Sequence, residues 1–410
     1  HYFHLNSADI NYTFKRKEVK MSSTRQSDIY KNNFICWKIL GLWSGRKPNK
    51  NYKYYSVIYI FITLIVYNSL LTLNLVFTPR EIEYLVREVI FYFTEITVTS
   101  KVFMIIIMRD KILATFSIMD GDDLDGDDEI SKKIIGKAQE DFNTLWKFFA
   151  VISHVAYLSQ VFVPIVIYFI LNTELNLPIC KYFFLTDELR ERYFIFWFIY
   201  QSWGMYGHMM YNVTIDSFIA GLLLNAVIQL KILNAKFSNL KLNEHEKKLS
   251  LDIQDKIQML KLRKCLTRYD VVLKYCDNVQ SILDVTMFVV FGMSSVIICV
   301  VLCGLLLPSS TETFVFMVAY LFAMTLQICV PGYLGTLLNY ESQELVFAAY
   351  CSEWIPRSES FKSSIRAFVG RANKPIEITG LKMFPLSLST FTSIVKTAYS
   401  FFALIRSFQD

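Results

Sequence analysis

The sequence predicts an all-α membrane protein with seven transmembrane helices. Of its 410 residues, 53% are hydrophobic and 16% are aromatic, which is more apolar surface than one soluble core of this size can bury. Apolar stretches long enough to cross about 30 Å of hydrocarbon as helices recur along the chain. The predicted spans are residues 54–77, 86–108, 148–171, 193–216, 285–307, 314–338 and 386–405.

Helices 4 to 7 are expected to extend beyond the bilayer. The chain stays apolar from span 4 to Leu230, and residues 231–284 contain neither Pro nor Gly, so helices 4 and 5 continue. Two further helical stretches follow span 6, within residues 339–385, before the breakers Pro375 and Gly380. Together these extensions predict a cytosolic helical bundle, which serves either packing within the chain or subunit assembly.

The charges of the loops predict the orientation of the chain in the membrane. Of the 42 Lys and Arg residues, 34 fall in segments that lie on one side of the seven spans. Lys and Arg next to spans are retained on the cytoplasmic side. The N-terminus is therefore predicted to be cytoplasmic and the C-terminus extracellular, which is the reverse of a G-protein-coupled receptor.

The residues that enzymes and metal sites require are scarce. The five His and eight Cys are scattered, and the chain has no Cys-x-x-Cys pair, phosphate-binding loop or nucleophile elbow. The acidic run 120–129 fails as a calcium loop, because placing Gly126 at the sixth position puts Lys132 at the twelfth, where a Glu is needed. We therefore predict no enzyme activity, no metal, no cofactor and no nucleic-acid partner, and interpret 120–129 as a solvated, flexible cytosolic turn.

The last span carries a polar stripe. Thr390, Ser393, Thr397 and Ser400, followed by Leu404, are spaced by three or four residues and so share one face of a helix. A helix surrounded by lipid would gain nothing from this stripe, so it must face protein or water. The stripe predicts a helix that lines a pore or packs closely against another helix.

The C-terminal part of the chain resembles the signature of insect odorant receptors. The similarity covers about seventy residues. It is carried by Glu341, Ser342, Leu345, Ala348, Tyr350, Trp354, Pro375, Gly380, Phe384-Pro385-Leu386, Leu388, Thr390-Phe391, Lys396, Tyr399-Ser400 and Phe402. Chain length, span spacing and the inverted topology agree with this family.

The resemblance implies a function. The family forms tetrameric, odorant-gated, non-selective cation channels, in which a tuning subunit assembles with a shared co-receptor in the plasma membrane of olfactory sensory neurons. The co-receptor has a much longer loop between spans 4 and 5 than this chain, so the resemblance favours a tuning subunit that binds a small volatile molecule. The alternatives are a gustatory-receptor-like channel, a G-protein-coupled receptor and a secondary transporter, although internal repeats typical of transporters are not evident.

The predicted spans divide the chain into segments. Met21 is a candidate initiator, which makes residues 1–20 a candidate extension. The expected segments are a cytoplasmic N-terminal part (1–53), helices 1 to 4 (54–230), a cytosolic helical loop (231–284), helices 5 and 6 (285–338), cytosolic anchor helices (339–385) and a pore-lining helix 7 (386–410).

Candidate site residues follow from the topology and from the pocket that the resemblance implies, among spans 2, 3, 4 and 6 in their extracellular halves. The expected ligand-binding residues are Phe91, Phe93, Thr94, Tyr157, Gln160, Val161, Tyr200, Trp203, Met209, Tyr320 and Met324. The expected lower pore is lined by Ser393, Thr397 and Ser400, and Leu404 with Ile405 forms an apolar constriction that gates by dewetting.

Four charged residues fall within the spans. Glu95, Lys101, Asp216 and Lys396 would be costly in lipid, so they are expected to face protein or water. Pairing with each other or with the chain is the favoured interpretation of these residues, ahead of contact with a ligand.

Overall fold

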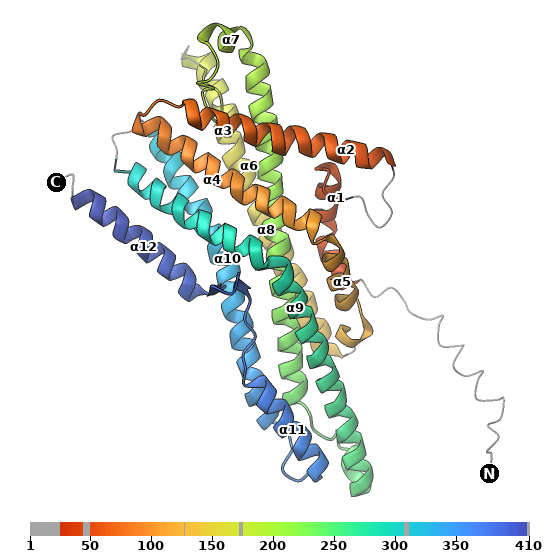
Figure 1. The fold of residues 1–410 in the computed structure, drawn as a ribbon. Coiled ribbons are helices and arrows are strands. Elements are labelled where there is room, and N and C mark those ends of the chain that lie inside the picture. Colours follow the sequence, from red (N-terminus) through yellow and green to blue (C-terminus); the bar gives the residue numbers. More distant parts are fainter. Residues whose placement is uncertain (1–24, 44–49, 127, 172–174, 307–310, 408–410) are drawn as a thin grey trace.

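The computed structural model describes residues 25–43, 50–126, 128–171, 175–306 and 311–407, so the candidate extension 1–20 lies outside the described residues. The chain is almost entirely helical (Figure 1). Its elements are η2 (Gln26–Tyr30), α1 (Lys31–Ile39), α2 (Lys50–Ile60), η3 (Phe61–Val66), α3 (Tyr67–Phe77), α4 (Ile82–Ile107), α5 (Arg109–Met119), η4 (Asp122–Leu124), α6 (Glu129–Leu171), α7 (Asp187–Arg192), α8 (Phe194–Ser238), η5 (Glu246–Lys248), α9 (Leu251–Gly304), α10 (Thr311–Tyr350), α11 (Glu359–Ala372), β1 (Thr379–Gly380), β2 (Phe384–Pro385) and α12 (Leu388–Ser407).

Six helical segments of the described chain are long and apolar enough to cross a membrane, which confirms the predicted helical membrane class. They are Lys50–Phe77, Tyr84–Ile107, Glu129–Ile170, Phe194–Ser238, Leu251–Gly304 and Thr313–Tyr350. The predicted seventh span corresponds to α12, whose 20 residues extend over about 30 Å. The orientation of the spans and a seventh crossing stay predictions.

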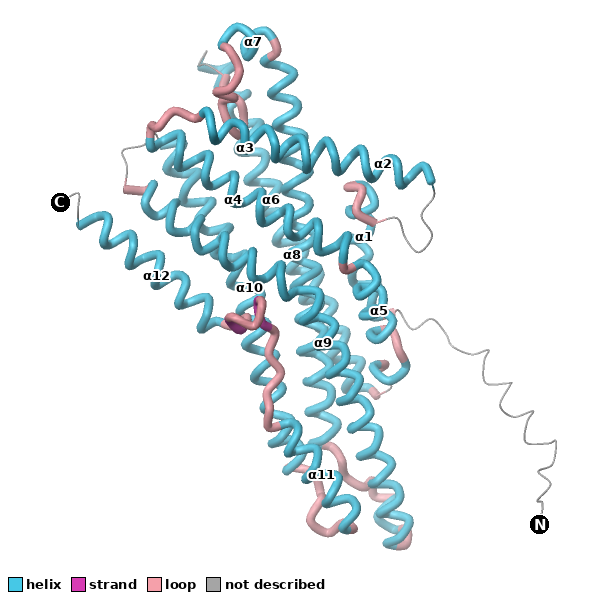
Figure 2. The backbone as a smooth tube through the Cα atoms, viewed as in Figure 1, coloured by secondary structure: helices cyan, strands magenta, loops and turns pink. Residues whose placement is uncertain are grey.

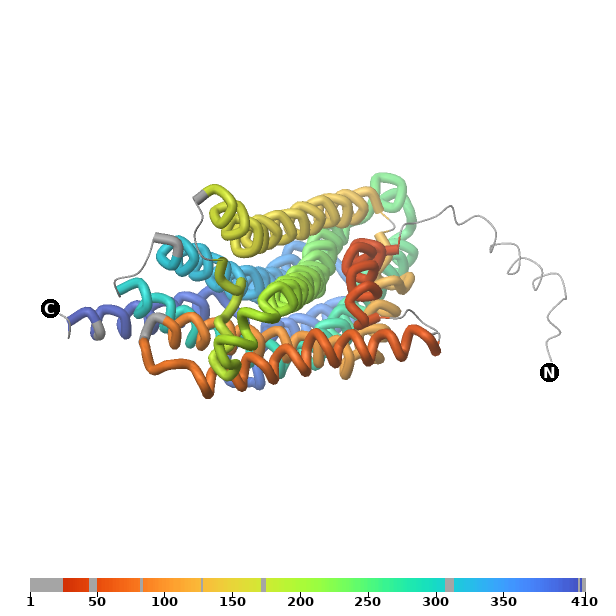
Figure 3. Tube along the Cα trace, turned by 90° about the horizontal axis from the view of Figure 1, so that it is seen from above, coloured from red at the N-terminus to blue at the C-terminus, as the bar shows by residue number. Residues whose placement is uncertain are grey.

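The helix α8 forms the centre of the molecule. Its 45 residues run without interruption between α6 and the α2 to α4 segment (Figure 3), and most of the apolar part is buried. Two glycines allow the close packing: a Cβ on Gly204 would lie 2.3 Å from the Tyr67 ring, and one on Gly221 would lie 2.5 Å from the Tyr30 ring. Most of the apolar part of the helix is thus buried, because small residues admit aromatic neighbours.

The N-terminal segment packs on α8. The Asn33 side chain donates to the Thr214 carbonyl at 2.6 Å and to the Ser217 hydroxyl at 2.8 Å. The Trp37 indole donates to the Thr214 hydroxyl at 3.0 Å. These bonds satisfy polar groups that burial would otherwise leave without a partner.

Long helix ends meet in one bundle, visible at the bottom of Figure 1, which we call the distal bundle: residues 231–238, 251–284, 339–350 and α11. Phe368 of α11 stacks on Phe237 of α8 at 4.5 Å and meets Tyr269 of α9 edge-on at 5.0 Å. The predicted continuation of helices 4, 5 and 6 into a helical bundle is therefore what the structure contains, whereas the predicted extension of helix 7 is absent from the described residues, because α12 begins only at Leu388 and α11 is a separate helix. Its cytosolic location stays a prediction.

A short antiparallel hairpin of β1 and β2 precedes α12 and was not expected from the sequence (Figure 2). Leu381 and Lys382 at its turn both have positive φ, which is the geometry that matches the right-handed twist of a tight hairpin. Gln280 of α9 holds the hairpin, because its amide exchanges hydrogen bonds of 2.7 and 3.1 Å with the backbone of Thr379. The start of α12 is thereby tied to α9.

The acidic run 120–129 leaves Asp122 and Asp123 exposed, as the interpretation of a solvated turn expected, but its backbone is held by other parts of the chain. Leu124 is fully buried, and Arg268 of α9 donates to the backbone carbonyls of residues 123, 124 and 125 at 3.1 to 3.2 Å. Asp128 at its end accepts from the Ser131 hydroxyl at 2.6 Å and pairs with Lys236 at 2.9 Å. The local sequence is polar, but a distant guanidinium binds its carbonyls and orders it.

Candidate functional site

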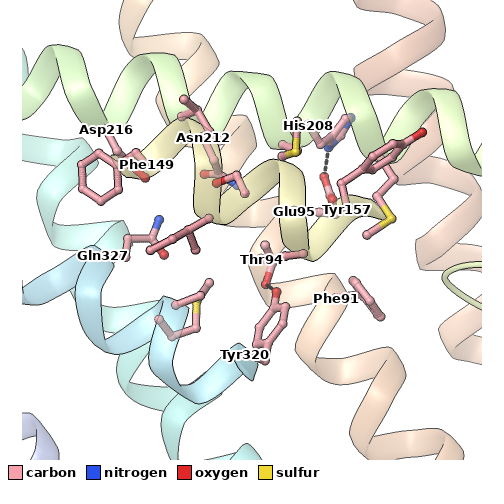
Figure 4. Close-up of a pocket in the computed structure, with 18 of the residues that line it drawn as sticks. Phe91, Thr94, Glu95, Phe149, Tyr157, His208, Asn212, Asp216, Tyr320 and Gln327 are labelled. Atoms are coloured by element: carbon pink, nitrogen blue, oxygen red, sulfur yellow. Dashed lines mark hydrogen bonds and ion pairs between the residues drawn. The ribbon is translucent and has the colours of Figure 1, made fainter. Parts of the chain in front are cut away.

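A cavity of about 200 Å³ lies between α4, α6, α8 and α10, with Tyr67 of α3 and Ile179 of the segment before α7 completing its wall (Figure 4). Its wall is mainly aromatic, aliphatic and sulfur-bearing, with a few polar groups. Such walls suit a small apolar molecule that a few polar groups orient. The cavity is smaller than the typical site of a drug-sized ligand, which spans roughly 300–1,000 Å³.

One polar pair in the wall joins α4 to α8. The Nδ1 atom of His208 contacts the Glu95 carboxylate, and the Nε2 atom contacts the backbone carbonyl of Thr63. Tyr67 packs on the imidazole with ring centroids 4.6 Å apart. Both ring nitrogens thus face oxygen atoms, so His208 links α8 to α4 on one side and to η3 on the other.

A second pair lies deeper on the same two helices. The Lys101 ammonium is fully buried and lies 2.6 Å from an Asp216 carboxylate oxygen and 2.8 Å from the Asn212 side-chain oxygen. Glu95, Lys101 and Asp216 are therefore paired inside the protein, as expected from the cost of an isolated charge in a membrane. Glu95 and Asp216 also line the cavity, so pairing and exposure to the cavity coexist.

Hydrogen bonds also fix the aromatic part of the wall. The hydroxyls of Thr94 and Tyr320 contact each other across α4 and α10. The Tyr157 hydroxyl donates to the Ser202 carbonyl at 3.2 Å, and Phe91 stacks on Phe316 at 5.7 Å. The rings are held in place before any ligand arrives.

The structure brings six of the eleven candidate ligand residues around this cavity: Phe91, Thr94, Tyr157, Met209, Tyr320 and Met324. The other five lie elsewhere. Phe93 lies about 200° around α4 from Phe91 and packs into the core. Val161 is buried one turn beyond Tyr157, and Gln160 is half-buried beside it.

The other two of those five lie on α8 and contact η3 and α2 rather than the cavity. The Tyr200 hydroxyl donates to the Ile62 carbonyl at 3.2 Å. Trp203 is 42% exposed and meets Tyr59 edge-on. Binding by any of the eleven stays a prediction.

Sequence reasoning missed most of the polar wall. Helical spacing could have pointed to several of the missed residues. Phe149 and Ser153 precede the selected Tyr157 by eight and four residues, and Gln327 follows the selected Tyr320 by seven, so they share the same helix faces. No signal in the sequence pointed to Tyr67 or Ile179, which come from outside the four expected spans.

The outer face of α12 carries the predicted pore residues. The hydroxyls of Ser393, Thr397 and Ser400 are exposed, and each donates to the backbone carbonyl four residues earlier at 2.8 to 2.9 Å. Leu404 is 51% exposed, whereas the side chain of Ile405 lies outside the described residues. Lys396 is exposed on the same helix. The stripe faces away from the rest of its own chain.

Comparison with known proteins gives a consistent result. A family model described as 7tm Odorant receptor matches residues 81–399. Odorant receptor 10 of Aedes albopictus is 26% identical over 49% of this chain and 52% of its own, and odorant receptor 67c of Drosophila melanogaster is 26% identical over 52% and 51%. The chain thus spans about half the length of the curated relatives it matches.

Solved structures show the same fold. The olfactory receptor OR5 from Machilis hrabei in complex with eugenol superposes with a TM-score of 0.80, at 19% identity, over 93% of this chain and 98% of that chain. The structure described without eugenol gives a TM-score of 0.79.

Proposed function

Since the chain belongs to the 7tm odorant receptor family of insects, we propose that it is a tuning subunit that binds a small volatile molecule and gates a non-selective cation channel. In this proposal it forms a heterotetramer with the odorant receptor co-receptor, in the plasma membrane of olfactory sensory neurons. Its N-terminus is cytoplasmic and its C-terminus extracellular, as the loop charges predict.

The cavity is the observation that carries the proposal. It lies between α4, α6, α8 and α10 and offers about 200 Å³ with a largely apolar wall. Apolar burial drives the binding of molecules with few polar atoms. The OR5 structure holds eugenol, a small phenol, which supports a ligand of similar size here.

The connection between α8 and α9 supports the role of tuning subunit. Only residues 239–250 separate the two helices, and the 3-10 turn η5 occupies part of them. The co-receptor of the family resembles this chain but carries a much longer insertion at this place.

The outer face of α12 supports the role of pore helix. Ser393, Thr397 and Ser400 bond to their own helix backbone, so they can face water or another subunit without breaking contacts within the chain. We propose that they line the wet lower pore and that Leu404 with Ile405 forms the apolar constriction. Close packing of small residues between helices is the competing role of the same stripe.

The test is electrophysiology with a cavity-filling variant. Co-expression with the co-receptor should give odorant-evoked cation current that persists when G-protein signalling is blocked by GDPβS. Ala323→Phe, which fills the cavity wall, should abolish the response. Val318→Phe, on the same helix and 45% exposed, is the matched control and should respond like the wild type.

Other outcomes would point elsewhere. Absence of current together with gradient-coupled uptake would indicate a transporter. Current that disappears with GDPβS would indicate a G-protein-coupled receptor, and equal loss of response in both Phe variants would remove the cavity from the proposal.

A further inference from the structure

The four helices around the cavity form a ring with four seams, and side chains join three of these seams. The two polar pairs described above join α8 to α4. Contacts of Thr94 and Phe91 with aromatic residues of α10 join α4 to α10. Tyr157 joins α6 to α8, because it donates to the Ser202 carbonyl and packs on Tyr206 with ring centroids 5.3 Å apart. The fourth seam lies between α6 and α10.

The seam between α6 and α10 is not joined in this way. Among the described residues that line the cavity, no hydrogen bond, ion pair or ring contact connects α6 with α10. The backbone of α6 packs against α8, whereas α10 packs against α8, α9 and α12. The wall of the cavity at this seam therefore consists of two helix faces that no side-chain contact ties together.

Four residues that line the cavity border this seam: Ile152 and Ala156 of α6, and Ala323 and Leu326 of α10. The two on α6 lie about 140° and 100° around the helix from Tyr157, which faces α8. The two on α10 lie about 120° and 180° around the helix from Met317, which lies beside Gly304 of α9. Each pair is thus on the side of its helix that is turned away from the packed neighbour.

The exposure of these residues shows that the seam is open to the outside. Ala156 is exposed although it lines the cavity, and the other three residues of the seam are partly exposed. Wall residues at the joined seams differ: Phe91 and Glu95 are each 8% exposed, and His208 is 3% exposed. The cavity therefore has its mouth between α6 and α10.

The surface around this mouth is apolar. Residues 148–171 and 314–338, which form these parts of α6 and α10, contain no Asp, Glu, Lys or Arg. Large apolar side chains next to the seam are 49% to 61% exposed: Val155 and Val163 on α6, and Val315 and Phe322 on α10. Exposed apolar side chains within a membrane span face lipid. The mouth therefore opens into the bilayer.

The end of the cavity toward α7 is closed by the segment 177–183. Ile179 of this segment lines the cavity and is 2% exposed. It belongs to one buried cluster with Tyr67 and Phe91, which line the cavity too. A ligand coming from this end, which the loop charges predict to be extracellular, would have to displace a packed core.

Hydrogen bonds hold this segment in place. The Gln201 side chain of α8 accepts from the backbone N–H groups of Ile179 and Cys180 at 3.0 and 3.4 Å, and donates to the Cys180 carbonyl at 2.9 Å. Asn74 of α3 accepts from the backbone N–H of Phe183 at 2.7 Å. Opening this end would break these bonds together, whereas the mouth between α6 and α10 has none to break.

We propose that the ligand enters the cavity from the bilayer, through the seam between α6 and α10, and that the cavity takes uncharged molecules that dissolve in lipid. A permanently charged molecule cannot follow this route, because it would lose its hydration in the hydrocarbon. This inference rests on the proposed function, because it names the route and the class of ligand for the same cavity.

The first experiment compares homologous ligands on the full chain with the co-receptor. A panel of volatile alcohols, esters, ketones and phenols identifies an active skeleton, and short homologues that differ by one methylene are then applied. The association rate per aqueous concentration, taken from the onset and washout of the current, should rise about fourfold per methylene, because each methylene favours lipid by about 0.8 kcal/mol. Direct entry from water would give nearly equal rates, because diffusion and orientation limit it.

Two variants at Ala156 test the seam. Ala156→Val and Ala156→Leu narrow the mouth and should slow onset and washout together by about fivefold, while the half-maximal concentration stays within about twofold. A residue that acted only as a wall contact would change the half-maximal concentration instead. Val151→Phe is the control, because Val151 is 62% exposed and lies about 140° around α6 from Ala156. Its rates should equal those of the wild type.

The outcomes separate this inference from the function beneath it. No current with any panel compound, despite surface expression, would overturn the proposed function and this inference with it. Association rates that do not depend on the length of the homologue would overturn the inference alone. Wild-type kinetics in the Ala156 variants would do the same, and Ala156→Val, the smaller change, keeps this test available if Ala156→Leu does not reach the surface.

Discussion

The helices α8 and α12 are both expected to cross the membrane, yet they treat polar residues in opposite ways. In α8, Asp216 and His208 form ion pairs with α4, and the helix is buried on nearly all sides. In α12, Ser393, Thr397 and Ser400 bond only to carbonyls of their own helix among the contacts described, and their face is exposed. The difference teaches that α8 is an internal scaffold, whereas α12 offers its polar face to whatever lies outside the subunit.

The largest expected effect is a loss of stability when the ion pair of α8 with α4 is broken. Asp216→Asn leaves the Lys101 ammonium buried without a counter-ion, which should lower the free energy of unfolding by about 3–5 kcal/mol. Thermal unfolding of the purified protein in detergent measures the change. The double variant Lys101→Met with Asp216→Leu should recover most of the loss.

The matched control makes the same substitution in an exposed pair. Asp252 pairs with Lys256 at 2.7 Å, and both side chains are more than 70% exposed, at 77% and 72%. Asp252→Asn should change the stability by less than about 0.5 kcal/mol. Equal effects of the two Asp→Asn changes would show that the Lys101 pair is solvated rather than buried.

The next largest effect concerns how α12 is attached. A Cβ on Gly335 of α10 would lie 2.0 Å from the backbone oxygen of Leu386, just before α12 begins. Backbone cannot move aside as a side chain can, so Gly335→Ala should destabilise the protein by roughly 1–3 kcal/mol and reduce ligand-evoked current. Differential scanning of unfolding together with current recordings measures both.

Gly292→Ala is the control for this substitution. A Cβ there meets nothing within 4 Å, so the helical propensity of Ala should stabilise α9 by about 0.5–1 kcal/mol. A wild-type response of Gly335→Ala would mean that the contact between α10 and the start of α12 is loose.

The third prediction sharpens the role of the exposed face of α12. If Leu404 belongs to an apolar constriction, Leu404→Thr wets it and should raise the current without ligand by about fivefold, equivalent to roughly 1 kcal/mol of bias toward the open state. Tyr399→Thr is the control, because Tyr399 is 63% exposed and lies about 140° around the helix from Leu404. An unchanged basal current in Leu404→Thr would favour helix packing over gating.

The smallest effect lies outside the membrane spans, at the start of α6. Burial raises the pKa of Asp128, but hydrogen bonds from Ser131 and Lys236 outweigh it and lower the pKa from 3.8 to about 2. A depressed carboxylate pKa stabilises the folded state fully above the unfolded value, and this stability is lost as the pH falls through the folded value.

The corresponding measurement is a pH series of unfolding midpoints for the wild type and Asp128→Asn. The wild type should be the more stable by less than about 1 kcal/mol above pH 4, because the pair is partly exposed. The difference should shrink as the pH falls from 4 toward 2. A difference that stays constant over this range would exclude ionisation of Asp128 as its source.

Much of the cavity could be predicted because the resemblance to insect odorant receptors implied its place among spans 2, 3, 4 and 6. Tyr157, Met209, Tyr320 and Met324 were selected from helices whose spans and depth follow from apolar length and loop charge. The choice failed where depth alone did not say which side of a helix faces inward, as with Phe93 and Trp203.

The sequence could not predict which residues from distant parts of the chain contact each other. The sequence predicted that Lys101 and Asp216 would be paired, but 115 positions separate them, and helical spacing says nothing about which helices are neighbours. For the same reason the sequence did not predict the hydrogen bonds from Arg268 to the acidic run 120–129, or the close contact between Leu386 and Gly335. Each is a contact between elements distant in sequence.

The sequence by itself determined the helical membrane class, the length of the helices and the polar stripe of α12, because the bilayer imposes hydrophobicity and hydrogen bonding on every span. Only the tertiary structure decided which charges lie next to each other and which face of each helix forms the cavity. Those outcomes depend on the packing of helices against one another, and packing is set by side-chain shape at crossings that no single helix encodes.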